Sequence, residues 1–174
     1  MLKALLLITC LCCSGFTQAM DHQLVGLINQ RLSWMKDVAG NKAIHHQAIE
    51  DLSQEEKVLE ATLNQAAERG IEASSIRPFI MAQMDAAKAI QYRYRADWLA
   101  QPEENWQPED LNLVRTNISK LSSEIIDSIA DELYKKGNLD HYSDKSYMKF
   151  LNQQNLSQAD KSLLLRTLSQ IRLK

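Results

Sequence analysis

Apolar residues recur along most of this chain at spacings of three and four, the period of an amphipathic helix. No stretch alternates apolar and polar residues for long enough to indicate a strand. We therefore expect an all-α protein, a single-domain bundle of about six helices, three of them long. The helices are expected over about 21–47, 51–69, 74–100, 110–136, 143–153 and 157–173.

Local signals mark several of the expected helix ends. Gly70 and Gly137 follow the second and fourth helices, where glycine commonly stops a helix. Asp110 can cap the fourth helix, and Pro78 falls in the first turn of the third, where a missing N–H costs least. The segment 102–108, with a proline at each end, is the one clear connector.

The first 19 residues have the form of a secretory leader. Lys3 supplies a positive charge, an apolar or small run follows from Ala4 to about Phe16, and Ala19 offers a cleavage site. We therefore expect a cleaved signal peptide over 1–19, a mature helical domain over 20–174 and a periplasmic location. The run is too short for a membrane span, which needs roughly 20 apolar residues.

Removing the leader also changes the chemistry that the chain can offer. All three cysteines lie within it, so the expected mature chain has no thiol and no disulfide. The leader also holds Lys3, so 20 − 1 = 19 basic residues face 22 acidic ones, a net charge of −3. This balance argues against a nucleic-acid or membrane partner. His45 and His46 are adjacent and point to different helix faces, so they cannot chelate a metal together and we expect no metal site.

Polar groups interrupt the apolar stripes of the four longest helices. Arg31 and Lys42 share the stripe of the first, eleven residues and therefore roughly 16 Å apart. Glu55 interrupts the second stripe, Gln91 the third, and Arg115 shares a face of the fourth with apolar neighbours. We expect all five to turn inward.

Two interpretations of these inward groups stay open from the residues alone. Arg31 and Glu55 can form a buried ion pair, with Gln91 a satisfied core amide. Alternatively, Arg31, Lys42 and Arg115 leave an excess of positive charge in a partly dry interior. Uncompensated buried charge is costly, so such a pocket fits a ligand with two carboxylates.

The order and spacing of these groups resemble those of the secreted helical chorismate mutases, the gamma subclass, over about residues 24–136. That resemblance implies an all-α fold with a complete site in each protomer, usually a homodimer, using no metal or cofactor. The motifs are Arg31, Lys42, Ile49-Glu50-Asp51, Gln54-Glu55-x-x-Val58-Leu59, Ala87-x-x-x-Gln91-Tyr92, Ala96-Asp97-Trp98 and Asp110-Leu111-x-x-x-Arg115.

The resemblance also implies roles for these residues on the substrate chorismate. Arg31 and Arg115 are expected to clamp its carboxylates, and Lys42 and Gln91 to donate to its ether oxygen. Further substrate-binding positions are expected around the ring hydroxyl and the second carboxylate: Asp51, Gln54, Glu55 and Ala87.

The chain departs from the family pattern at two of those positions. Gln54 stands where the family typically has an arginine, and Ala87 where a hydroxyl side chain is common. Both changes weaken the expected grip on one carboxylate. Lys57 and Lys88 are candidates to compensate for the loss.

Two other functions are compatible with the same overall pattern. A non-catalytic periplasmic binding or chaperone-like protein would share the leader and the amphipathic helices, but it does not explain cations inside the stripes. An isochorismate pyruvate lyase could use a similar cationic pocket. Conversion of chorismate by the mature protein separates these alternatives.

Overall fold

The computed structural model describes residues 22–174, and the expected leader with its cysteines and cleavage site lies outside them. The described part is all-helical, as predicted, and it contains no helix long and apolar enough to cross a membrane. Its elements are α2 (Gln23–Ser33), α3 (Met35–Ile44), α4 (Leu52–Glu68), α5 (Ala73–Ala100), α6 (Leu111–Lys136), the 3-10 segments η1 (Asp140–Ser143) and η2 (Lys145–Phe150), and α7 (Gln158–Ser169).

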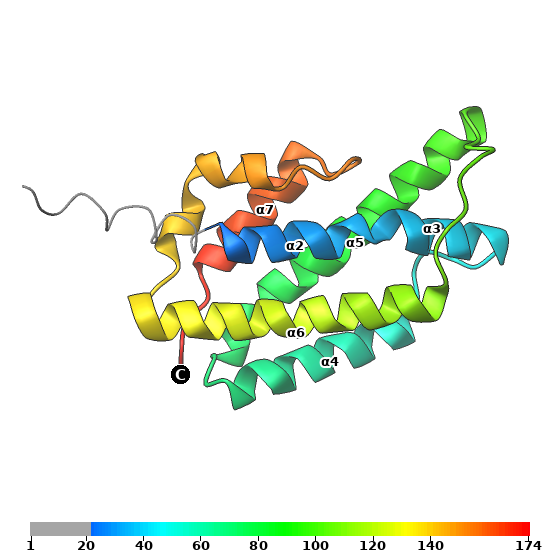
Figure 1. Ribbon diagram of the computed structural model, residues 1–174. Coiled ribbons are helices and arrows are strands. Elements are labelled where there is room, and N and C mark those ends of the chain that lie inside the picture. Colours follow the sequence, from blue (N-terminus) through cyan, green and yellow to red (C-terminus); the bar gives the residue numbers. More distant parts are fainter. Residues whose placement is uncertain (1–21) are drawn as a thin grey trace, which may run out of the picture.

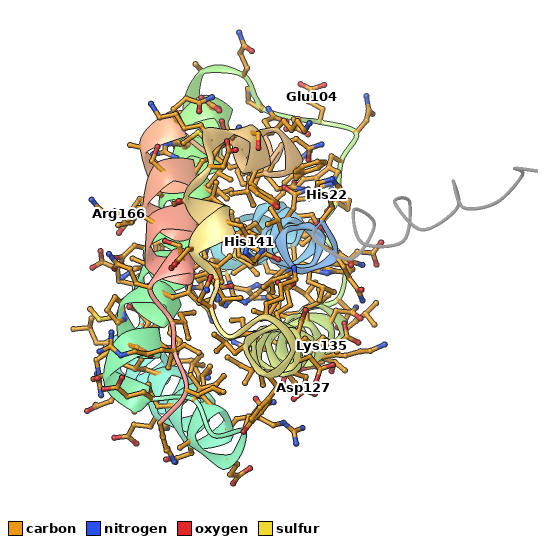
Figure 2. The ribbon with its side chains drawn as sticks, turned by 90° about the vertical axis from the view of Figure 1, so that its left-hand side faces the viewer. His22, Glu104, Asp127, Lys135, His141 and Arg166 are labelled. Carbon is orange, nitrogen blue, oxygen red and sulfur yellow. The ribbon has the colours of Figure 1, made fainter. Side chains whose placement is uncertain are left out.

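Helix α5 is the element against which most of the others pack. It contacts α3, α4 and α7 along its length, while α6 lies against α2 and α4 on the other side. In Figure 1, α5 crosses behind α2 and α3, and α6 runs beside them. Figure 2 looks nearly along α2 and shows it in the middle of the molecule, between α6 and the pair formed by α5 and α7. The interior between these helices therefore receives side chains from α2, α3, α4, α5 and α6.

The single helix expected over 21–47 is wrong in two respects. It is interrupted at Trp34, because the Ser33 hydroxyl donates to the Gln30 carbonyl at 2.7 Å, a local bond that bends helices. It also ends early, at Ile44. The residue after the cap, His46, takes a left-handed conformation (φ 53°), and Gln47 N–H donates to the Lys42 carbonyl at 2.8 Å. This Schellman arrangement closes a helix without glycine.

The next three helices match their predicted spans to within about a residue. Asp51 caps α4 by accepting from Gln54 N–H, and Asp110 caps α6. Gly70 and Gly137 follow in left-handed conformations, with φ of 77° and 81°. Pro78 is the sixth residue of α5, so it lies in the second turn rather than the first.

The C-terminal part departs most from expectation. The helix expected over 143–153 is two short 3-10 segments, because Asp144 is extended (ψ 126°) and caps the second of them through Ser146 N–H. Ser157 and Asp160 form a capping box that starts α7 at Gln158, later and shorter than the predicted 157–173 helix. Beyond α7 the chain pairs Leu173 with Ile71, which ties the C-terminal segment to the α4–α5 turn.

The connector between α5 and α6 is fastened onto α3. Glu103 accepts from Lys36 Nζ at 2.5 Å, and the Glu109 carbonyl accepts from the Asn41 amide at 2.9 Å. The Trp106 ring lies directly on Gly40, where an added Cβ would come within 2.7 Å of it. The connector therefore holds in place the helix that carries Lys42.

Gly40→Ala tests this fastening. The added methyl must displace the Trp106 ring, and overpacking of this kind costs about 1–3 kcal/mol. We expect a lower melting temperature and altered tryptophan fluorescence. Gly26→Ala is the matched control: its Cβ meets nothing within 4 Å, so it should raise the free energy of unfolding by about 0.5–1 kcal/mol. Equal effects of the two substitutions would contradict a packed connector.

Candidate active site

Arg31, in the last turn of α2, is a buried cation without a buried acid. Its side chain is 8% exposed, its Nε donates to the Ser122 hydroxyl at 3.0 Å, and its Nη1 has no hydrogen-bond partner. Burial lowers the pKa of the guanidinium to about 10, so it remains charged at neutral pH. Within residues 22–174 Arg31 forms no ion pair, so the alternative of an Arg31–Glu55 pair is wrong.

Lys42, in the last turn of α3, is held at the edge of the same interior. Its Nζ donates to the carbonyl of Ile49, in the loop that leads to α4. Burial lowers the pKa of Lys42; Asp51 and Glu55 oppose that change, and Arg115 and Arg95 add to it. The ammonium therefore lies close enough to two acids and two arginines to sense all four charges.

Gln91 projects from α5 into the core and is 5% exposed. Its Nε2 donates to the Ala87 carbonyl at 3.1 Å and contacts the Met35 sulfur at 3.6 Å, while its Oε1 has no partner. Because a thioether is a weak acceptor, one amide hydrogen of Gln91 can turn to a better acceptor at little cost. Met35 lies one turn after Arg31 along the α2–α3 segment, so Gln91 and Arg31 face the same interior.

Glu55 and Asp51 organise the start of α4 beside Lys42. Glu55 is half-buried and accepts from Lys88 Nζ at 2.9 Å and from the Asp51 backbone N–H at 3.3 Å. The hydrogen bond to Glu55 raises the pKa of Lys88, with burial opposing it. Because Glu55 is tied to Lys88, its charge is largely compensated and does not cancel that of Arg31.

Arg115 does not point into the core as predicted. It is exposed, near the start of α6, and the buried stripe of that helix passes through its neighbour Val114 and then Leu121 and Ile125. The buried face of α6 is therefore rotated by one residue from the face that the sequence predicted. Arg115 is nevertheless near Lys42, whose pKa it lowers. Its place is at the rim of the cationic region.

The structure also shows where the two departures from the family pattern, Gln54 and Ala87, lie. Ala87 is 7% exposed and lies one turn before Gln91, whereas Gln54 is exposed and contributes its backbone N–H to the Asp51 cap. Lys88 cannot readily compensate, because Glu55 and Asp85 engage its ammonium at 2.9 and 3.3 Å. Lys57 is exposed.

The chemistry available here is that of an anion-binding interior. Arg31 and Lys42 supply two charges from consecutive helices, and Gln91 adds a neutral donor from a third. No group of three or more His, Cys, Asp or Glu side chains in residues 22–174 could hold a metal ion. Fixed donors in a water-poor interior act strongly on negative charge that develops in a reaction.

The comparisons with known proteins agree with that chemistry. Residues 16–92 match the model of the chorismate mutase type II family. The chain is 50% identical over 153 residues to the secreted chorismate mutase of Yersinia pestis, covering 87% of this chain and 82% of that protein. It belongs to the chorismate mutase type II family.

Further relatives support the membership. The chain is 40% identical over 148 residues to the monofunctional chorismate mutase of Enterobacter agglomerans, covering 85% of this chain and 81% of that protein. The crystal structure of the Yersinia pestis secreted chorismate mutase superposes with a TM-score of 0.82, covering 87% of this chain and 98% of that one. The all-helical fold of this chorismate mutase family member is therefore shared over nearly all of the described residues.

Sequence reasoning missed three polar groups of this interior. Ser122 holds Arg31, Arg95 lies near Lys42 and donates to the Gln47 carbonyl, and Gln83 is buried on α5. Gln83 carried a signal in the sequence, because it lies four residues before Ala87 and eight before Gln91, on the same face of the predicted helix. Ser122 and Arg95 carried no such signal, because their roles depend on how separate helices pack.

Lys42→Met tests whether Lys42 serves a ligand or the fold. Burial lowers the pKa of Lys42, so its charged form is less stable in the folded protein than in the unfolded chain. Wherever Lys42 is charged in the folded protein, its ammonium therefore costs folding free energy. We expect Lys42→Met to keep or raise the melting temperature while turnover of chorismate falls by about 10²–10³-fold or more.

The exposed Lys57 on the neighbouring helix provides the control for charge alone. Lys57→Met should leave both turnover and melting temperature close to those of the unmodified chain. A fall of several degrees in the melting temperature of Lys42→Met would instead make its bond to Ile49 a structural one.

Proposed function

We propose that this chain converts chorismate to prephenate, the activity of its family, in the interior bounded by Arg31, Lys42 and Gln91. The observation that carries the proposal is the buried guanidinium of Arg31, which has an unpaired Nη1 and no acidic partner in residues 22–174. Chorismate is a small dicarboxylate, and one of its carboxylates would supply the missing negative charge. The bond to Ser122 orients Arg31 for that contact.

The reaction is an intramolecular rearrangement in which the ether C–O bond breaks while a C–C bond forms. It transfers no proton to the protein and needs no nucleophile. The protein must hold the enolpyruvyl side chain over the ring, which is a proximity effect. In this proposal, Arg31 within the core and Arg115 at the rim each bind one carboxylate and so restrict the substrate to that conformation.

Stabilisation of the developing charge falls to Lys42 and Gln91. Lys42 has three N–H donors, of which one is used on the Ile49 carbonyl. Gln91 uses one amide hydrogen on the Ala87 carbonyl and leaves the other against the Met35 sulfur. Both side chains thus retain a donor for the ether oxygen, whose negative charge grows toward the transition state. An interaction that strengthens along the reaction raises kcat.

The acidic residues at the start of α4 complete the proposed site. Glu55 retains acceptor capacity beyond its bonds to Lys88 and Asp51, so it can accept from the ring hydroxyl of the substrate. Asp51, as the cap of α4, fixes the backbone on which Glu55 sits. The exposed Gln54 and the buried Ala87 border this region, on α4 and α5 respectively.

We also propose that the chain is exported to the periplasm, with the leader cut after Ala19 and residues 20–174 as the mature enzyme. The form of the leader and the secreted relative from Yersinia pestis support export. Mass spectrometry of the protein recovered from a periplasmic extract checks the cut, and a retained Met1 would contradict it.

A homodimer is the proposed assembly. Two large apolar side chains, Leu99 and Leu52, are 89% and 74% exposed in the single chain, and a second copy could cover such surface. Sedimentation of the purified mature protein decides between monomer and dimer.

Incubation of the mature protein with chorismate tests the function directly. Formation of prephenate supports the proposal, whereas binding without turnover would favour a non-catalytic binding protein. Release of pyruvate from isochorismate, with chorismate left unchanged, would favour the lyase.

Gln91→Glu tests the role assigned to Gln91. An amide donates at every working pH, whereas a carboxyl group donates only when protonated and otherwise repels the ether oxygen and the substrate carboxylates. The unmodified chain should show a nearly flat kcat/KM from about pH 5 to pH 8, because the substrate carboxylates and Arg31 keep their charges throughout. Gln91→Glu should be active at acid pH and lose activity as the pH rises through the pKa of the new carboxyl. Parallel profiles for the two proteins would show that Gln91 does not face the ether oxygen.

A further inference from the structure

Gln83, on α5, is a buried amide that nothing described above uses. Its side chain is 6% exposed, and its Oε1 is buried without a hydrogen-bond partner. Buried polar groups in folded proteins nearly always have a partner, so an unpartnered amide indicates a missing ligand or water. Arg31 Nη1 and Gln91 Oε1 are also buried without a hydrogen-bond partner. Arg31, Gln83 and Gln91 are thus three buried side chains that each have an unpartnered polar atom.

The position of Gln83 on its helix directs it toward the proposed site. It lies four residues before Ala87 and eight before Gln91, so the three residues share one face of α5, spaced about 6 Å apart along its axis. All three are buried on that face. Gln91 meets Met35 of α3 there, one turn beyond Arg31, so Gln83 extends the same polar row deeper into the molecule.

The contacts between α4 and α5 also indicate how deeply Gln83 lies. Helices α4 and α5 are joined by the short turn at Gly70 and bridged by the Lys88–Glu55 ion pair. Gln83 lies five residues from Lys88 toward that turn, below the level of Glu55. The buried Gln83 amide therefore lies on α5 one turn before Ala87, the position where the family pattern commonly has a hydroxyl side chain.

We propose that Gln83 is a substrate-positioning residue whose amide Nε2 donates to the carboxylate bound by Arg31. This inference rests on the proposed function and assigns it one more residue. Turning the amide about its last bond brings Nε2 to the place now held by the unpartnered Oε1, where an incoming carboxylate requires a donor. Ala87, one turn further along the same face, has no polar group of its own to offer the carboxylate. Because Gln83 contacts a carboxylate rather than the ether oxygen, it contributes to binding in the ground state and the transition state alike.

Two substitutions of similar volume test the donor role by steady-state kinetics at pH 8. Gln83→Met removes the amide and should raise KM about 10-fold with kcat changed by less than about 3-fold, the signature of lost uniform binding. Gln83→Glu places an ionisable carboxyl against the substrate carboxylate and should raise KM by about 100-fold or more. Melting temperatures are measured in parallel, and Gln83→Asn, whose shorter amide cannot reach, replaces Gln83→Met if that variant does not fold.

Gln65 on α4 offers a matched control. It is another partly buried amide, but its Oε1 accepts from the Ser123 hydroxyl at 3.4 Å, so this oxygen has a partner within the fold. Gln65→Met and Gln65→Glu should leave KM unchanged, whatever they do to the melting temperature. A rise in KM confined to the Gln83 variants supports the proposal.

Two results would overturn it. A KM for Gln83→Glu within about 2-fold of that of the unmodified chain would mean that Gln83 accepts from the substrate hydroxyl or meets no substrate. Lower melting temperatures with unchanged KM in all Gln83 variants would make the amide purely structural. These outcomes presuppose an active unmodified chain, and if that chain does not convert chorismate, it is the proposed function that fails.

Discussion

The structure depends on one electrostatic constraint, the burial of the Arg31 guanidinium with no acid beside it. Burial lowers its pKa only to about 10, so the group stays charged in the core at any physiological pH. The Ser122 hydroxyl is neutral and satisfies one donor of five. Removing a charge from water without a countercharge is costly, and the packing of α2 against α6 must offset that cost. The uncompensated positive charge of Arg31 therefore favours the binding of an anion.

The remaining polar groups can be understood from the way the acids are distributed. Glu55 is the acid best placed to neutralise the interior, yet it is engaged by Lys88 from α5. Asp51 is occupied as the cap of α4 and is exposed. The acids of the site thus stabilise helix ends and interhelical pairs. The positive potential around Arg31 and Lys42 remains available to a ligand.

The sequence predicted most of this interior because a helix presents one face at fixed spacing. Arg31 and Gln91 fell in stripes of three and four and are indeed buried, and the Gly70 and Gly137 stops were correct. Arg115 fell outside the core because α6 buries the adjacent Val114, a rotation of about 100° that periodicity over a few residues does not resolve. The break at Trp34 depends on a single side-chain bond from Ser33 that many helical serines do not make. The partner of Glu55 could not be predicted, because helix spacing says nothing about which neighbouring helix supplies it.

The same constraint explains why the connector between α5 and α6 is so firmly attached. Lys42 lies in the last turn of α3, where a helix readily frays, and its charge is repelled by Arg95 and Arg115. Without further contacts, the last turn of α3 would fray and the Lys42 ammonium would move toward water. The Schellman closure at His46 fixes the helix end from one side, and the Trp106 ring on Gly40 fixes it from the other. A donor that must meet charge only in the transition state is effective to the extent that it cannot relax beforehand. Under the proposed function, the packing around α3 therefore serves catalysis as much as Lys42 itself does.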